Sequence, residues 1–336
     1  MSNFTAILFS TILIFLFATT FTAWRVVMPE AGENMDKAEL SESEQKLAGQ
    51  LKKDVFALAE DIGERNMHRR GSMDLTVDWI ENRAREIGYD PEKHSYEIRD
   101  GQFAGRSADN IKLEITGTAN PAEIVVIGAH FDSVHGSPGA NDNASAVAVL
   151  LALTEWFRER PQPQTLRFLF FANEEPPFFH THNMGSYAYA RTCRQRGEDI
   201  TAMIALDGLG FFSDEADSQR YPVPGLGLLY PDTANFIGFV TRLRDRNLLQ
   251  KVSKSFRSQA SIASEAAALP GFIPGVYWSD HWAFWEHDYP ALLVTDTLLF
   301  RDPDYHTPAD TPGRLDYESM ARVAEGLKQV ISELAN

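Results

Sequence analysis

The fold is decided by the stretch EIVVIGAHFD, residues 123–132. Its first seven residues form a nearly continuous apolar run, which is typical of a short strand covered on both faces of a sheet. The run leads into His130 and Asp132, and alternation along an extended chain places both on the same side. A metal-binding histidine usually donates its second ring nitrogen to a carboxylate. The stretch therefore predicts a buried strand that ends in a metal ligand and its orienting carboxylate, although His-x-Asp alone is more often an ordinary polar loop.

Similar apolar runs lie on both sides of this stretch and alternate with segments of helical periodicity. Residues 111–115 alternate as in a half-buried strand, and short apolar runs follow at 166–172, 202–206 and 291–295. The expected helices are residues 41–62, 72–87, 144–159, 184–196, 234–249 and 316–334. This alternation predicts an α/β fold with a mixed, largely parallel central sheet and helices on both faces. We expect the Gly- and Pro-rich stretch 208–231 to be irregular and to form one wall of a pocket.

The composition excludes several classes of function. The 336 residues include 31 Lys and Arg against 47 Asp and Glu, a formal net charge of −16, whereas nucleic-acid binding depends on clustered cations. The single cysteine, Cys193, excludes an internal disulfide and any cysteine-rich zinc module. A hydrophobic content of 44% is sufficient for a globular core. Any metal ion must therefore be bound by histidines and carboxylates.

The N-terminal segment differs from the rest of the chain. Residues 4–24 carry no formal charge and are long enough for one transmembrane helix. Residues 1–28 fit either an uncleaved membrane anchor or a signal peptide, with no cation before the apolar run and only a poor cleavage site after it. The lone cation Arg25 would by itself keep the body of the protein in the cytoplasm. Residues 29–40 are predicted to be a linker, and residues 41–336 one domain of catalytic size.

A second polar motif, GANDNAS, spans residues 139–145 and opens an expected helix. Asn and Asp before a helix are common N-caps. Asp142 lies between Asn141 and Asn143, which is more than capping requires, so it is also a candidate metal ligand. The sequence alone leaves both interpretations open.

Two adjacent carboxylates, Glu174 and Glu175, follow the apolar run at 166–172. Charge at the end of a buried strand is costly unless it is paired or bound to a metal ion. Two carboxylates allow a division of labour, in which one binds a cation while its neighbour accepts a proton from water. The pair therefore predicts a metal ligand beside a general base.

Two more polar residues complete a set of candidate ligands. Asp207 ends the run at 202–206, and His306 follows the last apolar strand. The carboxyl ends of the strands in an α/β sheet open onto one crevice, so these side chains should meet. The candidate ligands are His130, Asp142, Glu175, Asp207 and His306. Five nitrogen and oxygen ligands suit two zinc ions that share one carboxylate, with manganese or cobalt as weaker alternatives.

Taken in order, these motifs resemble the co-catalytic zinc aminopeptidases of the aminopeptidase Y type, in the zinc-dependent exopeptidase superfamily that also includes glutaminyl cyclases. The resemblance runs from about residue 64 to the C-terminus and implies the zinc-exopeptidase fold. It implies that Asp142 bridges two zinc ions. His130 and Asp207 would complete one site, and Glu175 and His306 would complete the other.

The resemblance also implies roles for residues around the ligands. Glu174 corresponds to the general base, and we count Asp132, as the carboxylate that orients His130, with it among the catalytic residues. Asp280 and His281 match a supporting motif that lines the substrate pocket of the family. Tyr277 is a further candidate for substrate binding, because its phenol could stabilise a developing oxyanion.

Three functions are compatible with these observations. The first is an aminopeptidase that hydrolyses the N-terminal peptide bonds of peptides or proteins with two zinc ions and Glu174. The second is a one-zinc acyltransferase like the glutaminyl cyclases, because the insertion at 176–184 resembles theirs. The third is a non-catalytic, protease-like binding domain, which the complete ligand set disfavours. The resemblance further implies a body outside the cytoplasm, in the cell envelope, because such peptidases are mostly exported.

Overall fold

The computed structural model describes residues 39–336. The predicted transmembrane segment, residues 4–24, and nearly all of the predicted linker, residues 29–40, lie outside the described residues, so both stay predictions. Within residues 39–336 no helix has the length and apolar content needed to cross a membrane. The location of the body outside the cytoplasm likewise stays a prediction.

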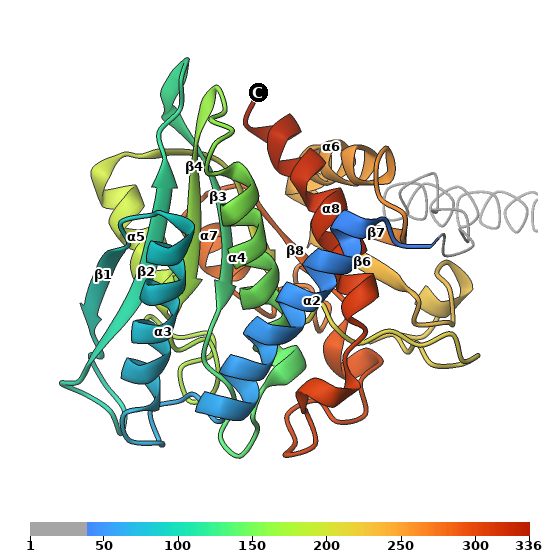
Figure 1. Cartoon of the computed structure of the whole chain (residues 1–336), viewed down its shortest axis with the longest axis horizontal. Coiled ribbons are helices and arrows are strands. Elements are labelled where there is room, and N and C mark those ends of the chain that lie inside the picture. Colours follow the sequence, from blue (N-terminus) through green and yellow to red (C-terminus); the bar gives the residue numbers. More distant parts are fainter. Residues whose placement is uncertain (1–38) are drawn as a thin grey trace, which may run out of the picture.

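The core of the fold is one eight-stranded sheet with the strand order β1-β2-β4-β3-β5-β8-β6-β7 (Figure 1). The strands are β1 (Glu92–Glu97), β2 (Ser107–Ile115), β3 (Asn120–His130), β4 (Gln164–Phe171), β5 (Asp199–Leu206), β6 (Phe236–Arg242), β7 (Ala263–Leu269) and β8 (Ala291–Thr295). β3 is parallel to β4 and β5, β5 is parallel to β8, and β6 is parallel to β7. The remaining three neighbouring pairs are antiparallel. The predicted mixed α/β sheet is confirmed.

Helices cover both faces of the sheet (Figure 1). They are α2 (Glu42–Phe56), α3 (Ser72–Ile87), α4 (Ala146–Phe157), α5 (Gly185–Arg196), α6 (Arg246–Arg257), α7 (His281–Glu286) and α8 (Tyr317–Leu334). The first core, with residues such as Ile80, Leu150 and Val330, joins α2, α3, α4, α6 and α8 to one face. The second core, with residues such as Ala190 and Phe284, joins α5 and α7 to the other.

The local sequence explains why these elements form where they were predicted. Val125 of β3 lies in the first core and its neighbour Val126 in the second, so both faces of this strand are buried and its apolar run is unbroken. Helix α2 begins with a capping box, in which the Ser41 hydroxyl accepts from the Glu44 amide and the Glu44 carboxylate accepts from the Ser41 amide. The apolar run of β3 and the capping box of α2 are both short-range sequence patterns.

The prediction of a helix over residues 234–249 is wrong in its first half. Phe236–Arg242 forms β6, which lies between β8 and β7, and α6 follows it. Ile237 and Phe239 pack into the first core, whereas Val240 packs against the second. Alternation of β-branched and aromatic residues between two cores is the pattern of a strand. The helical prediction considered only the wider spacing of the apolar residues in this segment.

The parallel strands at the centre of the sheet position the functional residues. β3, β4 and β5 point the same way, so their carboxyl ends lie at one edge of the sheet. His130 ends β3, Glu174 follows β4 closely, and Asp207 directly follows β5. As predicted, residues 208–231 form an irregular excursion, with only a short 3₁₀ turn at Leu226–Leu228.

Candidate metal centre

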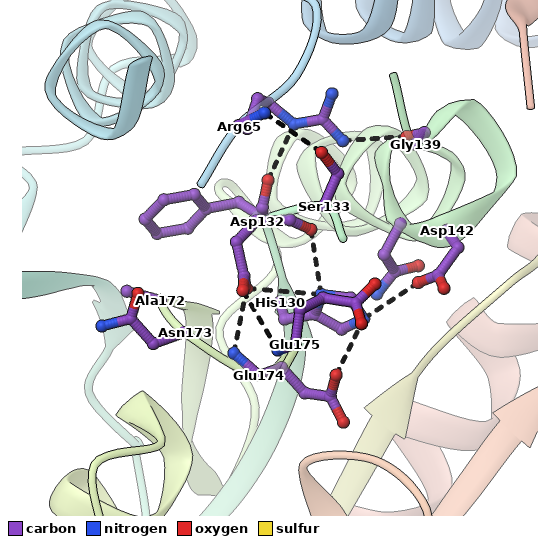
Figure 2. Close-up of polar contacts among 12 residues, drawn as sticks. Arg65, His130, Asp132, Ser133, Gly139, Asp142, Ala172, Asn173, Glu174 and Glu175 are labelled. Atoms are coloured by element: carbon purple, nitrogen blue, oxygen red, sulfur yellow. Dashed lines mark hydrogen bonds and ion pairs between the residues drawn. The ribbon is translucent and has the colours of Figure 1, made fainter. Parts of the chain in front are cut away.

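His130, the last residue of β3, is buried at the centre of the site (Figure 2). Its Nδ1 atom lies 3.2 Å from the carbonyl oxygen of Asp132 and 3.5 Å from its carboxylate. Its Nε2 atom lies 3.2 Å from Oδ1 of Asp142 and 3.3 Å from Oδ1 of Asp207. One ring nitrogen therefore faces Asp132, and the other faces two carboxylates, as in a histidine ligand held by a second carboxylate.

Asp142 is shared by two groups of potential ligands. While Oδ1 faces His130, Oδ2 lies 3.0 Å from Nε2 of His306, which is also 3.1 Å from Oε1 of Glu175. The donor atoms of His130, Asp142 and Asp207 lie within 4.8 Å of one another, as do those of Asp142, Glu175 and His306. The structure thus brings the five predicted ligands together in two groups of three, each group including Asp142.

The two asparagines beside Asp142 tie its loop to the chain after β5. Oδ1 of Asn143 accepts a hydrogen bond from the amide of Gly208 at 3.1 Å, and Oδ1 of Asn141 accepts one from the amide of Gly210 at 2.9 Å. Helix α4, which follows, begins without a side-chain cap. The GANDNAS motif therefore fixes a loop beside Asp207 instead of capping a helix.

The main chain of the same loop is held from a second direction by Asp310. Its carboxylate accepts hydrogen bonds from the amides of Asn141 at 2.8 Å and Asp142 at 3.2 Å. The loop is entered at Gly139, which has a φ of 61°, and a Cβ at this position would lie 2.4 Å from the carbonyl oxygen of Asp142. Only glycine permits both this backbone angle and this close approach.

A single carboxylate orients the glutamate pair (Figure 2). The amides of Glu174 and Glu175 donate to the two oxygens of Asp132, at 3.0 and 3.1 Å. Their side chains then diverge: Glu175 reaches His306, whereas Oε2 of Glu174 lies 3.9 Å from Nε2 of His130. Glu175 therefore belongs to a ligand group, and Glu174 lies beside the groups without belonging to either.

The buried charges of the site perturb one another strongly. Burial, with the charge of neighbouring Asp142, raises the pKa of Glu175 to about 8, and burial raises the pKa of Glu174 well above its usual range. Burial disfavours protonation of His130, but the charge of Asp207 and the hydrogen bonds to carboxylates outweigh it, so the pKa of His130 lies well above normal. Protons thus offset the repulsion among these carboxylates, and a bound divalent cation would replace them.

The donor set fits zinc. Each group offers one imidazole and two carboxylates, and zinc in catalytic sites takes three such protein ligands while a fourth position stays open. Oε1 of Glu175 is buried and faces Nε2 of His306, a second potential ligand atom of the same group, as expected for two atoms that can bind one metal ion. The chemistry and spacing of these residues are therefore those of a metal centre.

A sequence model of peptidase family M28 matches residues 110–331. The chain belongs to peptidase family M28. This M28 chain is 33% identical over 288 residues to the uncharacterized protein YfbL of Escherichia coli (strain K12), a match covering 83% of this chain and 85% of that protein. It is 28% identical over 227 residues to probable leucine aminopeptidase 1 of Trichophyton verrucosum (strain HKI 0517). That match covers 63% of this chain and 55% of the fungal protein.

Solved structures share the fold of the M28 chain. BSAP, a zinc aminopeptidase from Bacillus subtilis, superposes with a TM-score of 0.65 at 15% identity, covering 85% of this chain and 94% of that one. The glutaminyl cyclase of Fimbriiglobus ruber superposes with a TM-score of 0.60 at 16% identity, covering 90% of this chain and 99% of that one. At such identities the similarity establishes the fold, which an aminopeptidase and a cyclase have in common.

The M28 site also includes a residue that no sequence motif indicated. Arg65 is fully buried, and its guanidinium donates to the carbonyls of Phe131 and Gly139, each at 2.8 Å (Figure 2). Its amide donates to the hydroxyl of Ser133 at 3.0 Å. Burial lowers the pKa of Arg65 to about 10, which still leaves it charged at neutral pH. Arg65 therefore links the end of β3 to the loop that carries Asp142.

A cavity of about 360 Å³ opens from the M28 site. Glu174, Asp207 and His306 lie at one end, and the excursion supplies side chains such as Tyr221 and Tyr230 farther along. The predicted role of residues 208–231 as a pocket wall is confirmed.

The three residues predicted to bind substrate are not among the described residues that line this cavity. Tyr277 packs against the second core, and Nε2 of buried His281 lies 2.8 Å from the carbonyl of Val276. Asp280 is fully buried, burial raises its pKa to about 7, and within residues 39–336 neither carboxylate oxygen has a hydrogen-bond partner. Substrate binding by these three residues stays a prediction.

Proposed function

We propose that this M28 chain is a zinc-dependent aminopeptidase that releases N-terminal residues from peptides or proteins. The observation that carries the proposal is the pair of ligand groups sharing Asp142, with Glu174 beside them at the end of a cavity. Membership in a peptidase family and the similarity to a leucine aminopeptidase support the same reaction.

We infer that two zinc ions are bound, one by each group. His130 and Asp207 would hold one ion, Glu175 and His306 the other, and Asp142 would bridge them. Zinc ions bound there would polarise the scissile carbonyl and lower the pKa of water. The three carboxylates in the two groups carry enough negative charge to balance most of the charge on two divalent ions.

We assign Glu174 as the general base. Its carboxylate accepts a proton as the water oxygen bonds to the scissile carbonyl carbon, and returns the proton to the leaving nitrogen as the carbon–nitrogen bond breaks. The products are a free amino acid and a peptide shortened by one residue. Asp132 supports this step by fixing the main chain of Glu174 and the ring of His130 at once.

Metal analysis and a substrate panel test this function. The purified full chain should contain close to two zinc ions, release the first residue from aminoacyl substrates, and lose that activity on chelation until zinc is restored. Full activity after exhaustive chelation would exclude a metal-dependent reaction. A metal-loaded chain that cleaves no member of the panel would exclude the aminopeptidase.

Cyclisation of N-terminal glutamine is the second candidate, because a glutaminyl cyclase shares the fold and the insertion at 176–184 resembles cyclases. This acyl transfer joins the α-amine of glutamine to its side-chain carbonyl and releases ammonia. Ammonia release from a Gln-initial peptide with its length unchanged, together with a single bound zinc ion, would favour the cyclase. Release of free glutamine would favour the aminopeptidase.

A further inference from the structure

The cavity extends well beyond the metal centre, and its far part contains one partly buried carboxylate, that of Glu265. Glu265 lies on β7, the strand at the edge of the sheet farthest from β1. Neither the ligand groups nor the proposed proton transfer uses this residue. A charged carboxylate in a largely apolar cavity costs free energy, and the roles assigned so far do not explain its presence there.

The pairing of the strands places Glu265 in line with the metal centre. Leu206 of β5 pairs with Val294 of β8, so the next residues, Asp207 and Thr295, are level with each other. Thr295 pairs with Gly238 of β6, and Gly238 pairs with Glu265 of β7. Asp207, Thr295, Gly238 and Glu265 all line the same cavity. Three strand spacings separate the ends of this row, about 14 Å. The cavity therefore runs across the sheet from the metal centre to Glu265.

Gly238 keeps the middle of this path open. A Cβ there would lie 3.2 Å from the carbonyl oxygen of Thr295 and 3.6 Å from a methyl carbon of Thr297, and all three residues line the cavity. A larger side chain would project into the space between the two ends. The missing side chain therefore gives a long substituent access to Glu265.

The walls around Glu265 are apolar and aromatic, and the side chains described there do not pair with its carboxylate. The rings of Tyr221 and Tyr230 lie 5.9 Å apart, and their hydroxyls donate to the carbonyls of Pro231 and Ala266. Among residues 39–336 none donates a hydrogen bond to Glu265 or forms an ion pair with it. Burial raises the pKa of Glu265 to about 7, opposed by the charge of Arg257. A cation entering the cavity would find an acceptor that no residue of the described part of the chain satisfies.

We propose that this cavity binds the side chain of the N-terminal residue of the substrate, and that Glu265 selects lysine and arginine by pairing with their terminal cation. The proposal rests on the aminopeptidase function proposed above. Lysine and arginine extend about 6–7 Å from Cα, about half the length of the row, so a substrate Cα near the middle of the row would bring their cation to Glu265, which the shorter leucine side chain would not reach. Their methylene stems suit the apolar walls, and the tyrosine faces suit a guanidinium. The other charged side chain in this part of the lining, Arg220, is exposed.

Pairs of substrates that differ only in charge test the proposal. For the full chain loaded with zinc, kcat/KM should be about 10–100-fold higher for an arginine substrate than for its neutral isostere citrulline, and likewise for lysine over norleucine. Glu265→Gln should bring both ratios close to one by lowering kcat/KM for the arginine and lysine substrates. Glu318→Gln, an exposed substitution on α8 outside the cavity lining, should change neither.

A second variant tests whether the substrate side chain passes Gly238, instead of testing the charge of Glu265. Gly238→Val should lower kcat/KM for arginine and norleucine alike, by about tenfold or more, and spare an alanine substrate. Unchanged kinetics with all three substrates would place the long side chain elsewhere and overturn the proposal.

Binding to the metal-free chain separates this proposal from the aminopeptidase function. L-argininamide should raise Tm more than L-citrullinamide does, and Glu265→Gln should remove the difference. Cleavage of leucine and norleucine substrates without any preference for arginine or lysine would overturn the pocket assignment and leave the aminopeptidase intact. Absence of all cleavage, with Glu265-dependent binding of argininamide retained, would overturn the aminopeptidase and support Glu265 as a cation-binding group. A preference for acidic substrates would overturn the pocket assignment outright.

Discussion

The two ends of the cavity are built in different ways. At the metal end, buried polar side chains from several loops contact one another. One carboxylate, that of Asp132, contacts His130, Glu174 and Glu175. At the far end, apolar walls surround one carboxylate, Glu265, that has no hydrogen-bond partner among the described residues. The metal end is a network of polar groups that contact one another. The far end is an apolar pocket with one acceptor that no described residue pairs with.

This difference indicates where change is tolerated. A substitution of Asp132 or Asp142 disturbs several groups, because each of these carboxylates contacts two or more partners. A substitution near Glu265 alters one interaction and leaves the network in place. We therefore expect substitutions to change the catalytic step and the substrate preference independently of each other. Four experiments test this expectation.

The largest effect is expected for Asp142→Ala. Asp142 is the residue that both ligand groups share, so its loss should reduce zinc to well below one ion per chain and bring activity to background, a decrease of about 10⁴-fold or more. Elemental analysis and kcat/KM measure these effects. Binding of argininamide should persist, and Asp199→Asn, a change at an exposed residue, serves as the control. A variant that retains both zinc ions would contradict the bridging role.

Glu174→Gln should separate proton transfer from metal binding. The amide preserves size but accepts no proton, so we expect zinc content and substrate binding near those of the native chain and a decrease in kcat of about 10²–10⁴-fold. Glu175→Gln, the neighbouring control, should instead lose metal from one site. If Glu174→Gln lost zinc as Glu175→Gln does, or turned over within about threefold of the native chain, the two roles would be wrongly assigned.

Asp132→Asn should have a smaller effect on the metal end. An amide has one oxygen acceptor where the carboxylate has two, so it cannot receive both glutamate amides and also face His130 with a negative charge. We expect zinc affinity to fall by about 10–100-fold, the range for residues that support metal ligands. Competition with a fluorescent chelator measures this change. Native affinity would mean that the loops hold the ligands without Asp132.

The smallest effect is a pH dependence confined to the far end. Since the pKa of Glu265 is raised to about 7, its carboxyl is neutral below that pH and charged above it. The ratio of kcat/KM for arginine over citrulline should therefore rise by about threefold to tenfold from pH 6 to pH 8. Arg257, Tyr221 and Tyr230 are the other ionisable groups coupled to Glu265, and their charges do not change in this range. Glu265→Gln should give a flat ratio, and a falling ratio in the native chain would contradict this assignment.

The residues that meet at the metal end could be named from the sequence because its information there is local, and their roles as ligands stay predictions. Four of the five predicted ligands stand at or just after an apolar run or open a helix, whereas His306 follows the end of β8 by eleven residues. The predicted strands therefore already indicated that these side chains meet at one edge of the sheet. The capping box at Ser41 and the strand before His130 are likewise short-range patterns. Only the distances and the divergence of Glu174 from Glu175 needed the structure.

The far end could not be predicted in this way. Its strands were missed: residues 236–242 were assigned to a helix, and β7 has the sequence ASEAAAL, whose alanines favour a helix. Glu265 reaches the metal centre only through the strand order β5-β8-β6-β7, which local periodicity does not contain. Arg65 was missed for the same reason, because its partners Phe131 and Gly139 lie 66 and 74 residues away.

The buried guanidinium of Arg65 also sets the shortest piece of chain that can carry this chemistry. It donates to five main-chain carbonyls, those of Leu58, Gly63, Phe131, Pro138 and Gly139. The segment matched by the family begins only at residue 110 and contains every ligand. A fragment cut at that boundary would keep all the recognisable motifs, yet leave three carbonyls beside the site unpaired and its carboxylates without the charge of Arg65. The unit that must fold together is therefore longer than the segment that the family model matches.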